Sequence, residues 1–395
     1  MYQNELVLEA LNEKDRYVCF IFRFGKWLHY ENVIDPVVTG THLTETEATA
    51  WLAQIWSRDF RQELSTAEAK RKLFCWKNKP RHVLRSQQFD REFLEKYLFC
   101  ESNRIQVLMA QRGGRESLRQ TCRHRILLTH FYEPSTRTRL SFEFAALHLG
   151  MHVLTTENAA EFSSAIKGES AEDTIRILSG YHPDAIVVRH KQDGIIDRMA
   201  RFSSVPLING GEGTVQHPTQ ALLDVYTIFS EKKQIDGLTV VFGGDLKYGR
   251  TVRSLAYLLS KFDGVKLVFV SHPAFKMGED LKDHLRERKV EFEETESVNN
   301  ALRQADVVYW TRVQKERMSE DLAKESEKII SRFTIGREEL RNMKQDAILM
   351  HPLPRLREIR SDADLDPRSA YFRQAENGLY VRMALLQWVT EPEID

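Results

Sequence analysis

The chain has 395 residues, of which 42% are hydrophobic and 29% are charged, so it can bury two or three ordinary cores. Basic and acidic residues number 57 each, so no overall charge attracts nucleic acid or an anionic membrane. The four cysteines are widely separated, which argues against a zinc ribbon or a disulfide scaffold. No apolar run approaches the roughly 20 residues that span a bilayer, and the polar start is unlike a signal peptide. We expect a cytoplasmic protein that binds neither membrane nor nucleic acid.

Residues 1–82 are expected to form a small α+β extension. The run at 18–24 is rich in β-branched and aromatic residues and predicts a strand, followed by a turn at Gly25 and Lys26. Threonine or serine three residues before glutamate predicts helices over 48–56 and 69–76.

Four of the six tryptophans belong to this extension: Trp27, Trp51, Trp56 and Trp76. They suit either a small core or an aromatic docking face. The basic run at 70–85 is more typical of a solvated helix face than of a nucleic-acid site, because acidic residues accompany it. We therefore expect an accessory domain that serves assembly or regulation.

From about residue 125 onwards, short apolar runs alternate with helices. The run 126–132 predicts a strand, and Ser135 is a favourable N-cap for a helix that Gly150 ends. The helix prediction rests on an apolar stripe at helical spacing: Leu140, Phe144 and Leu147.

The first turn of this helix is suited to an anion. Its unpaired N–H groups and the positive end of the helix dipole lie beside hydroxyls and guanidiniums, those of Ser135, Thr136, Arg137, Thr138 and Arg139. A phosphate group fits such a site. Taken alone, the S-T-R-T-R sequence describes a capped helix with two surface arginines equally well.

The remaining apolar runs predict two parallel sheets in series. Strands of the first are expected at 126–132, 151–155, 184–189 and 205–209, and strands of the second at 238–242, 265–271, 306–310 and 347–350. Ser170 and Asp173 have capping-box spacing and begin a helix between the second and third strands. Helices of the second series are expected near 250–262, 279–288, 297–304 and 320–330. Two doubly wound α/β units fit this length better than one.

Polar and basic residues follow the strands, at the edge where doubly wound sheets bind ligands. Arg189 and His190 follow the third strand, and residues 209–220 follow the fourth and open a helix at Pro218. Three further motifs follow strands of the second sheet: G-G-D-L-K-Y-G-R-T at 243–251, T-R-V-Q-K-E-R at 311–317 and H-P-L-P-R at 351–355. Singly, each motif has an ordinary structural interpretation, but together they indicate a site for a polyanionic ligand.

These motifs occur in the same order in a known family. Residues from about 83 to 395 resemble the catalytic chains of aspartate carbamoyltransferases, and H-P-T-Q at 217–220 belongs to the shared set. Ornithine-using members typically carry H-C-L-P where this chain has H-P-L-P, so an ornithine-type or other amino-acid carbamoyltransferase is the alternative. The resemblance implies a carbamoyl-phosphate domain at 83–232, completed by a C-terminal helix at 376–395, and an aspartate domain at 233–375.

The resemblance also implies a role for each matching residue. Four hold the phosphate of carbamoyl phosphate: Ser135, Thr136, Arg137 and Thr138. Three face the carbamoyl oxygen, on which negative charge grows: Thr138, Arg189 and His217. The carbamoyl amide is accepted by Gln220 and by the backbone carbonyls of Pro352 and Leu353. The carboxylates of aspartate are gripped by Arg250, Arg312 and Gln314. No metal, cofactor or covalent intermediate is required.

The segment 161–168 resembles the family's mobile loop, which reaches into the active site of a neighbouring subunit. Ser163 and Lys167 match its contributing residues, with Lys167 facing both substrates, and Ile166 stands where a second lysine is common. The resemblance therefore implies a homotrimer with shared active sites. A larger assembly through residues 1–82 is a further expectation.

Two classes of function remain. The first is an active carbamoyltransferase that uses aspartate in de novo pyrimidine synthesis, and the second is a catalytically silent homologue kept as a scaffold. A silent copy is expected to have lost some of the matching residues, yet all of them are present. The active enzyme is therefore favoured.

Overall fold

The computed structural model describes the backbone of residues 6–11, 17–23, 26–31 and 62–64, and residues 81–159, 168–314, 327 and 329–391 in full. The chain divides into two compact units, Met1–Lys79 with Glu393–Asp395, and Pro80–Pro392. Among the described helices, none has the length and apolar character that crossing a membrane requires.

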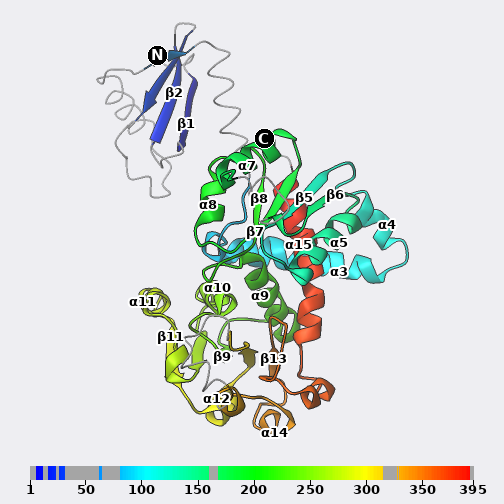
Figure 1. Ribbon diagram of the computed structural model, residues 1–395, viewed down its shortest axis with the longest axis vertical. Coiled ribbons are helices and arrows are strands. Elements are labelled where there is room, and N and C mark those ends of the chain that lie inside the picture. The colour runs from blue at the N-terminus through cyan, green and yellow to red at the C-terminus, as the bar shows by residue number, and fades with distance from the viewer. Residues whose placement is uncertain are drawn as a thin grey trace. The chain divides into compact units, whose positions relative to one another are not determined.

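The first unit contains a four-stranded antiparallel sheet in the order β1-β2-β3-β4 (Figure 1). Its strands are β1 (Leu6–Leu11), β2 (Tyr17–Arg23), β3 (Lys26–Glu31) and β4 (Gln62–Leu64). The second of them confirms the strand predicted at 18–24. The turn at Gly25 and the helices predicted at 48–56 and 69–76 lie outside the described residues.

The second unit begins with short helical segments that the apolar pattern did not predict. They are η1 (Ser86–Gln88), η2 (Phe93–Phe99), α3 (Cys100–Ala110) and α4 (Gly114–Arg119). A four-stranded parallel sheet follows, in the order β6-β5-β7-β8. Its strands are β5 (Ile126–Phe131), β6 (His152–Thr156), β7 (Ala185–His190) and β8 (Leu207–Glu212). All four confirm the predicted strands, with small shifts at their ends.

Helices cover both faces of this sheet, as the alternation of side chains along its strands requires. They are α5 (Thr136–His148), α7 (Ala171–Gly180), α8 (Ile195–Ala200) and α9 (Pro218–Lys232). Leu127 and Val187 pack in one core with residues of α5 and α9, whereas Leu128 and Ile186 pack in another with α7 and α8. The cap predicted at Ser170 is confirmed, because its Oγ accepts a hydrogen bond from Asp173 N at 3.1 Å.

A second parallel sheet has the order β11-β10-β9-β12-β13. Its strands are β9 (Thr239–Gly243), β10 (Lys266–Val270), β11 (Glu291–Thr295), β12 (Val307–Trp310) and β13 (Ile348–Met350). Four of these confirm predictions. The edge strand β11 was not predicted, because its sequence E-F-E-E-T carries one apolar residue.

Helices also lie on both faces of the second sheet. They are α10 (Arg250–Leu259), η4 (Pro273–Phe275), α11 (Glu279–Glu287), α12 (Val298–Gln304), α14 (Arg337–Leu340) and η6 (Ser361–Leu365). Val240 shares a core with α10 and α11, and Val241 shares another with α12 and α14. The helix predicted near 320–330 lies mostly outside the described residues. The prediction of two doubly wound α/β units is confirmed.

The last described helix is α15 (Tyr371–Thr390), which follows the second sheet but packs against α3, α5 and α9 of the first (Figure 1). Its buried side chains include Val381, Ala384 and Leu385. The second sheet is therefore inserted between α9 and α15, and the chain crosses between the two halves twice.

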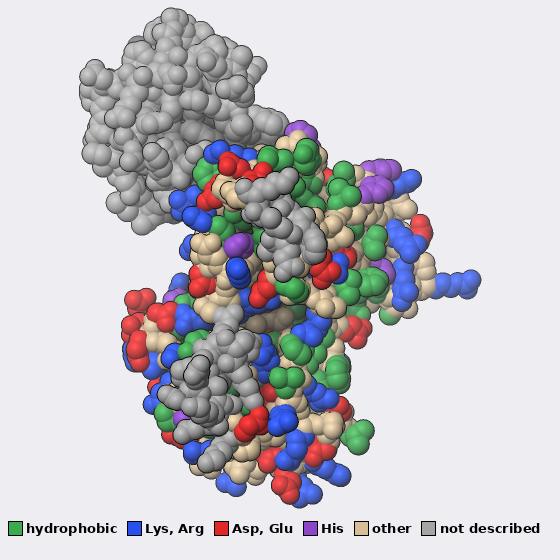
Figure 2. All heavy atoms as spheres, viewed as in Figure 1, with side chains coloured by type: hydrophobic (Ala, Val, Ile, Leu, Met, Phe, Trp, Pro, Cys, Tyr) green, Lys and Arg blue, Asp and Glu red, His purple; other side chains and the backbone are tan. Residues whose placement is uncertain are grey.

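The helix predicted after Ser135 is present, but the apolar stripe that predicted it does not face the core. Leu140 is 36% exposed, Phe144 55% and Leu147 53%. The side chains that pack inside are those of Phe142, Ala145 and Ala146. Figure 2 shows hydrophobic side chains at the surface over α5 and β6. The single chain thus leaves an apolar face of this helix open.

Candidate functional site

A cavity of about 460 Å³ lies between the two sheets, where strand ends and helix starts of both halves meet. Twelve of the residues to which the resemblance assigns a role fall among the described ones, and all twelve line the cavity. They are Ser135, Thr136, Arg137, Thr138, Arg189, His217, Gln220, Arg250, Arg312, Gln314, Pro352 and Leu353. The remaining two, Ser163 and Lys167, lie outside the described residues.

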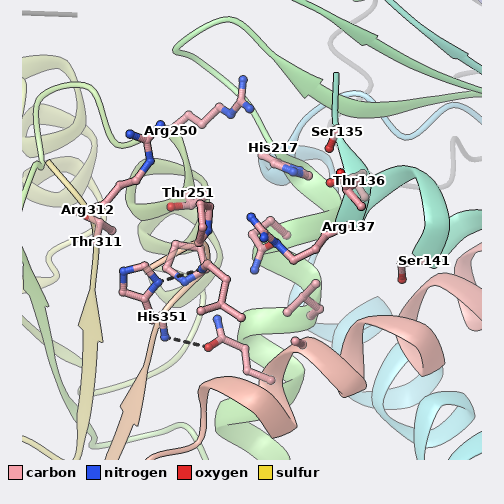
Figure 3. Close-up of a pocket in the computed structure, with 18 of the residues that line it drawn as sticks. Ser135, Thr136, Arg137, Ser141, His217, Arg250, Thr251, Thr311, Arg312 and His351 are labelled. Atoms are coloured by element: carbon pink, nitrogen blue, oxygen red, sulfur yellow. Dashed lines mark hydrogen bonds between the residues drawn. The ribbon is translucent and has the colours of Figure 1, made fainter. Parts of the chain in front are cut away.

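The first turn of α5 forms one wall of the cavity. Ser135 has the extended backbone of an N-cap, with φ of −158°, and Thr136 begins the helix. The side chain of Arg137 points into the cavity beside them (Figure 3). No acidic side chain among the described residues pairs with Arg137, and burial lowers the pKa of its guanidinium below the ordinary value. This wall therefore presents hydroxyls, N–H groups and an uncompensated positive charge, which suits a phosphate.

The expectation that Arg139 also faces the anion is wrong. Its guanidinium contacts Glu143 Oε1 at 3.0 Å and Glu157 Oε2 at 2.8 Å, and it does not line the cavity. Side chains two positions apart on a helix point to different faces, so only one of the two arginines can reach the cavity.

Arg189 and His217 come from the end of β7 and the start of α9. His217 is 5% exposed, and its Nδ1 has no hydrogen-bond partner among the described residues. Burial and the positive charges of Arg250 and Arg189 hold the pKa of His217 well below its ordinary value. The ring is therefore neutral and carries one N–H, the form that can donate to a carbonyl oxygen.

A glycine leaves room for the guanidiniums of Arg189 and Arg250 here. Gly211 has φ of +124°, and a Cβ at this position would lie 2.6 Å from Arg189 Nη1 and 3.4 Å from Arg250 Nη2. Larger residues would collide with Arg189 and strain the backbone. Arg250 in turn donates from Nη1 to the carbonyl of Gly213 at 2.6 Å.

The far side of the cavity is built by the loops after β12 and β13. Gln314 donates from Nε2 to the carbonyl of Tyr248 at 2.8 Å, and its backbone N–H donates to Asp245. Figure 3 shows Arg250 and Arg312 on the side of the cavity opposite Arg137. Residues 315–317 of the predicted T-R-V-Q-K-E-R motif lie outside the described residues.

The H-P-L-P loop is held by a buried histidine. His351 Nδ1 accepts from the backbone N–H of Leu353 at 2.9 Å, and Nε2 lies 3.0 Å from Glu358 Oε1. Because Nδ1 accepts, the ring proton sits on Nε2 and is donated to the carboxylate. Leu353 has φ of +53°, a conformation that a leucine adopts only when its surroundings require it. The pair thus fixes the loop whose carbonyls are the predicted acceptors.

Sequence reasoning missed three polar residues that line the cavity: Ser141, Gln374 and Arg382. Thr251, Thr311 and His351 also line it and lie in the predicted motifs, but no individual role was predicted for them. Arg382 is the most distant in sequence. It donates from Nη1 to Ser141 Oγ at 3.1 Å, and burial lowers its pKa to about 10. It lies in the middle of α15, so the rule that ligands gather at strand ends could not find it. The presence of a basic residue on an otherwise apolar helix face was the available signal.

The charge of the lining decides what the cavity can bind. Among the described residues, the lining contains five arginines, at positions 137, 189, 250, 312 and 382, and no acidic side chain. No cluster of three or more metal-ligating His, Cys, Asp or Glu residues occurs among the described residues. The arrangement suits a ligand, or a pair of ligands, with several negative charges.

Two family matches cover most of the second unit. Residues 81–230 match the family aspartate/ornithine carbamoyltransferase, carbamoyl-P binding domain, and residues 236–389 match the Asp/Orn binding domain of that family.

Among similar proteins, aspartate carbamoyltransferase 1, chloroplastic, of Pisum sativum is 50% identical over 305 residues, which is 77% of each chain. The aspartate carbamoyltransferase catalytic subunit of Methanocaldococcus jannaschii is 47% identical over 68% of this chain and 85% of its own.

The solved structures that resemble this chain are also aspartate transcarbamoylases. The catalytic subunit of M. jannaschii aspartate transcarbamoylase is similar with a TM-score of 0.71 and 41% identity, over 78% of this chain and 97% of that one. Aspartate transcarbamoylase from Trypanosoma cruzi in complex with N-(phosphonacetyl)-L-aspartic acid is similar with a TM-score of 0.71 and 35% identity, over 78% and 95% of the two chains.

Proposed function

The chain belongs to the aspartate/ornithine carbamoyltransferase family, and from that membership we propose that it transfers the carbamoyl group of carbamoyl phosphate to the amine of L-aspartate. The products are N-carbamoyl-L-aspartate and phosphate, and the reaction serves de novo pyrimidine synthesis. The observation that carries the proposal is the cavity between the two sheets, whose described lining has five arginines and no acidic residue.

The positions of the side chains support a division of labour. The first turn of α5, with Arg137, holds the phosphate of carbamoyl phosphate. Arg189, Thr138 and neutral His217 donate to the carbamoyl oxygen, and Gln220 with the carbonyls after His351 accepts from the amide. The amine nitrogen of aspartate forms a bond to the carbamoyl carbon while the carbon–oxygen bond to phosphate breaks. Negative charge develops on the carbamoyl oxygen during this step, and the fixed donors around that oxygen stabilise it. The leaving phosphate takes up the proton from the amine.

The charge of the lining also favours aspartate over ornithine. Aspartate brings two carboxylates, for which Arg250 and Arg312 offer bidentate partners. With ornithine the side-chain amine would attack, and the α-ammonium would lie in the same region. No acidic side chain lines the described part of the cavity to receive that ammonium.

A homotrimer with shared active sites is part of the proposal. The apolar face over α5 and the edge strand β6 supports it, because Phe144, Leu147 and Leu154 are each more than half exposed. A neighbouring subunit that covered this face would remove apolar surface from water, which is the main drive for association. Ser163 and Lys167 would then reach a neighbour's site, and residues 1–82 would extend the assembly.

A cytoplasmic location remains the prediction from the sequence. The names of the Pisum sativum and Arabidopsis thaliana relatives place those proteins in the chloroplast. Fractionation of source cells would decide between the two compartments.

A carbamoyl-transfer assay on the purified chain tests the function. Phosphate release is measured with carbamoyl phosphate and either aspartate or ornithine, and the Arg137→Ala chain, purified in parallel, controls for a contaminating host enzyme. We expect phosphate release with carbamoyl phosphate and aspartate, and none with carbamoyl phosphate and ornithine. Preference for ornithine would make the chain the ornithine-type alternative, and no turnover with either would favour the silent scaffold.

A further inference from the structure

A buried carboxylate lies directly behind the cavity wall. Asp224 on α9 is fully buried, and its Oδ1 accepts hydrogen bonds from Gln220 Nε2 at 2.8 Å and from Gln374 Nε2 at 2.6 Å. Its Oδ2 accepts from the hydroxyl of Tyr309 at 2.7 Å. The three donors come from α9, α15 and β12, so the carboxylate joins both halves of the unit.

This carboxylate determines which way the two amides point. An ionised carboxylate can only accept hydrogen bonds, so each glutamine must turn its NH2 group toward Asp224. The carbonyl oxygen of each amide then points the other way. For Gln220, which lines the cavity, the oxygen becomes the polar atom available to a ligand.

The amide of Gln374 links Asp224 to the H-P-L-P loop. Gln374 Oε1 accepts from the backbone N–H of His351 at 2.9 Å, and the His351 ring accepts from Leu353 N. A continuous series of hydrogen bonds therefore joins Gln220 to the loop of Pro352 and Leu353. The two groups expected to hold the carbamoyl amide are both attached to one carboxylate.

We propose that Asp224 is a positioning residue for the carbamoyl amide, because it turns the oxygen of Gln220 into the cavity and, through Gln374, holds the acceptor loop after His351. The inference rests on the proposed function, which supplies the ligand. Asp224 touches no substrate itself, but it orients the residues expected to contact the substrate.

The charge of Asp224 makes its effect depend on pH. Burial raises the pKa of Asp224 to about 7, while the three hydrogen bonds and the positive charge of Arg382 oppose that rise. The other titratable group against it is Tyr309, whose pKa burial raises well above the ordinary value, so it remains a donor. When Asp224 is protonated it carries a donor of its own, so it no longer requires both amides to turn their NH2 groups toward it. Binding of an amide-bearing ligand should therefore weaken as the pH falls below about 7.

Calorimetry on the full chain with two probes tests the inference. Phosphonoacetamide carries both the phosphonate and an amide NH2, whereas inorganic phosphate carries the anion alone. Asp224→Leu removes the carboxylate that accepts all three hydrogen bonds and should weaken phosphonoacetamide binding about tenfold or more while phosphate binding stays unchanged. Asp224→Asn keeps one acceptor oxygen and should fall between Leu and the wild type. Asp346→Asn, which changes an exposed aspartate, is the matched control.

Equal losses for both probes, or no loss for phosphonoacetamide in Asp224→Asn and Asp224→Leu, would overturn the inference. If the Asp224→Leu variant does not fold, Asp224→Asn and Tyr309→Phe together test the inference instead. Removing the Tyr309 donor raises the pKa of Asp224, so the pH at which phosphonoacetamide affinity halves should move upward, and an unmoved profile would contradict the positioning role. Because these are binding measurements, they are independent of turnover, whose absence in the wild type would instead count against the proposed function.

Discussion

Glu133 holds Arg189 in the cavity wall, with 3.1 Å between Glu133 Oε2 and Arg189 Nε. The carboxylate stands at the turn just before α5, and the arginine stands at the end of β7. The same guanidinium also donates from Nη1 to the carbonyl of Gly210 at 3.3 Å. The group expected to stabilise the carbamoyl oxygen is therefore oriented by the segment that also begins the phosphate site.

Replacing Glu133 by glutamine should lower kcat/KM for carbamoyl phosphate roughly tenfold, because a charge-assisted hydrogen bond that orients Arg189 is lost. Steady-state kinetics measure the effect. Glu92→Gln, which changes an exposed glutamate paired with Lys96, is the control and should leave kcat/KM unchanged. An unchanged value in Glu133→Gln would mean that Arg189 is positioned without this contact.

Arg137→Ala should abolish turnover while the chain remains folded. Loss of an uncompensated guanidinium from the phosphate site should cost about 2–5 kcal/mol of transition-state stabilisation. Arg139→Ala is the matched comparison, because Arg139 lies two residues further and pairs with Glu143 instead. It should reduce thermal stability and spare phosphate affinity, and the reverse pattern would place the phosphate on the other face of α5.

Arg250→Ala should weaken the binding of succinate, an aspartate analogue without the amine, by about tenfold or more while phosphate affinity is retained. Arg253→Ala, one turn further along α10, removes an ion pair with Asp280 and provides the control. Calorimetry with each ligand separates the two sites. Loss of phosphate binding in Arg250→Ala would contradict the assignment of this arginine to aspartate.

The buried His130 should make the protein less stable in mild acid. Neither of its ring nitrogens has a hydrogen-bond partner among the described residues, and burial, with a smaller effect of His190, lowers its pKa from 6.5 to about 4. The unfolded chain takes up the proton near pH 6.5, but the folded chain resists it down to about pH 4. The free energy of unfolding should therefore fall by up to about 3 kcal/mol across this window on account of His130.

Denaturant titrations at pH 7.5 and 4.5 measure this fall. His130→Phe keeps a buried ring and should reduce the difference between the two pH values. His152→Phe changes an exposed histidine on the neighbouring strand and should not. If both variants behave like the wild type, His130 is not a source of the acid sensitivity.

Mixing two inactive chains tests whether active sites are shared. If Lys167 serves a neighbouring subunit, mixed oligomers of Lys167→Ala and Arg137→Ala chains contain some sites with both residues intact. Dissociation and reassociation of the two variants should then restore part of the activity. Mixed oligomers that are seen by native mass spectrometry but stay inactive would show that each site is built within one chain.

The sequence was sufficient to locate most strands and the residues at their ends. Uninterrupted apolar runs mark strands buried on both faces, such as β7 and β12, and the ligand edge of the sheets follows from their parallel order. The edge strand β11 lacks that signal, because its charged side chains face water. Arg382 and Gln374 were missed for a different reason. They lie in the last helix, and only the tertiary fold brings that helix to the cavity.

The helix α5 shows a further limit of periodicity. Leu140, Phe144 and Leu147 have the spacing of a core-facing stripe, yet they lie outside, while Ala145 and Ala146 pack inside. Periodicity identifies an apolar face but does not say what covers it. For the same reason the sequence could not show that Arg137 lines the cavity and Arg139 does not. A motif shows neither which face of the helix meets the ligand nor where the nearest carboxylate lies.

The position of α15 has a consequence for synthesis of the chain. The core of the first parallel sheet needs side chains from Tyr371–Thr390, which are translated after the second sheet. The core on one face of the second sheet uses side chains up to Tyr371, the first residue of α15, and none beyond it. The half that contains the second parallel sheet can therefore finish folding before the half that contains the first, although it is translated later. A nascent chain that stalls between β13 and α15 would expose the apolar surfaces of α5 and α9, which makes this interval the one in which chaperones are most needed.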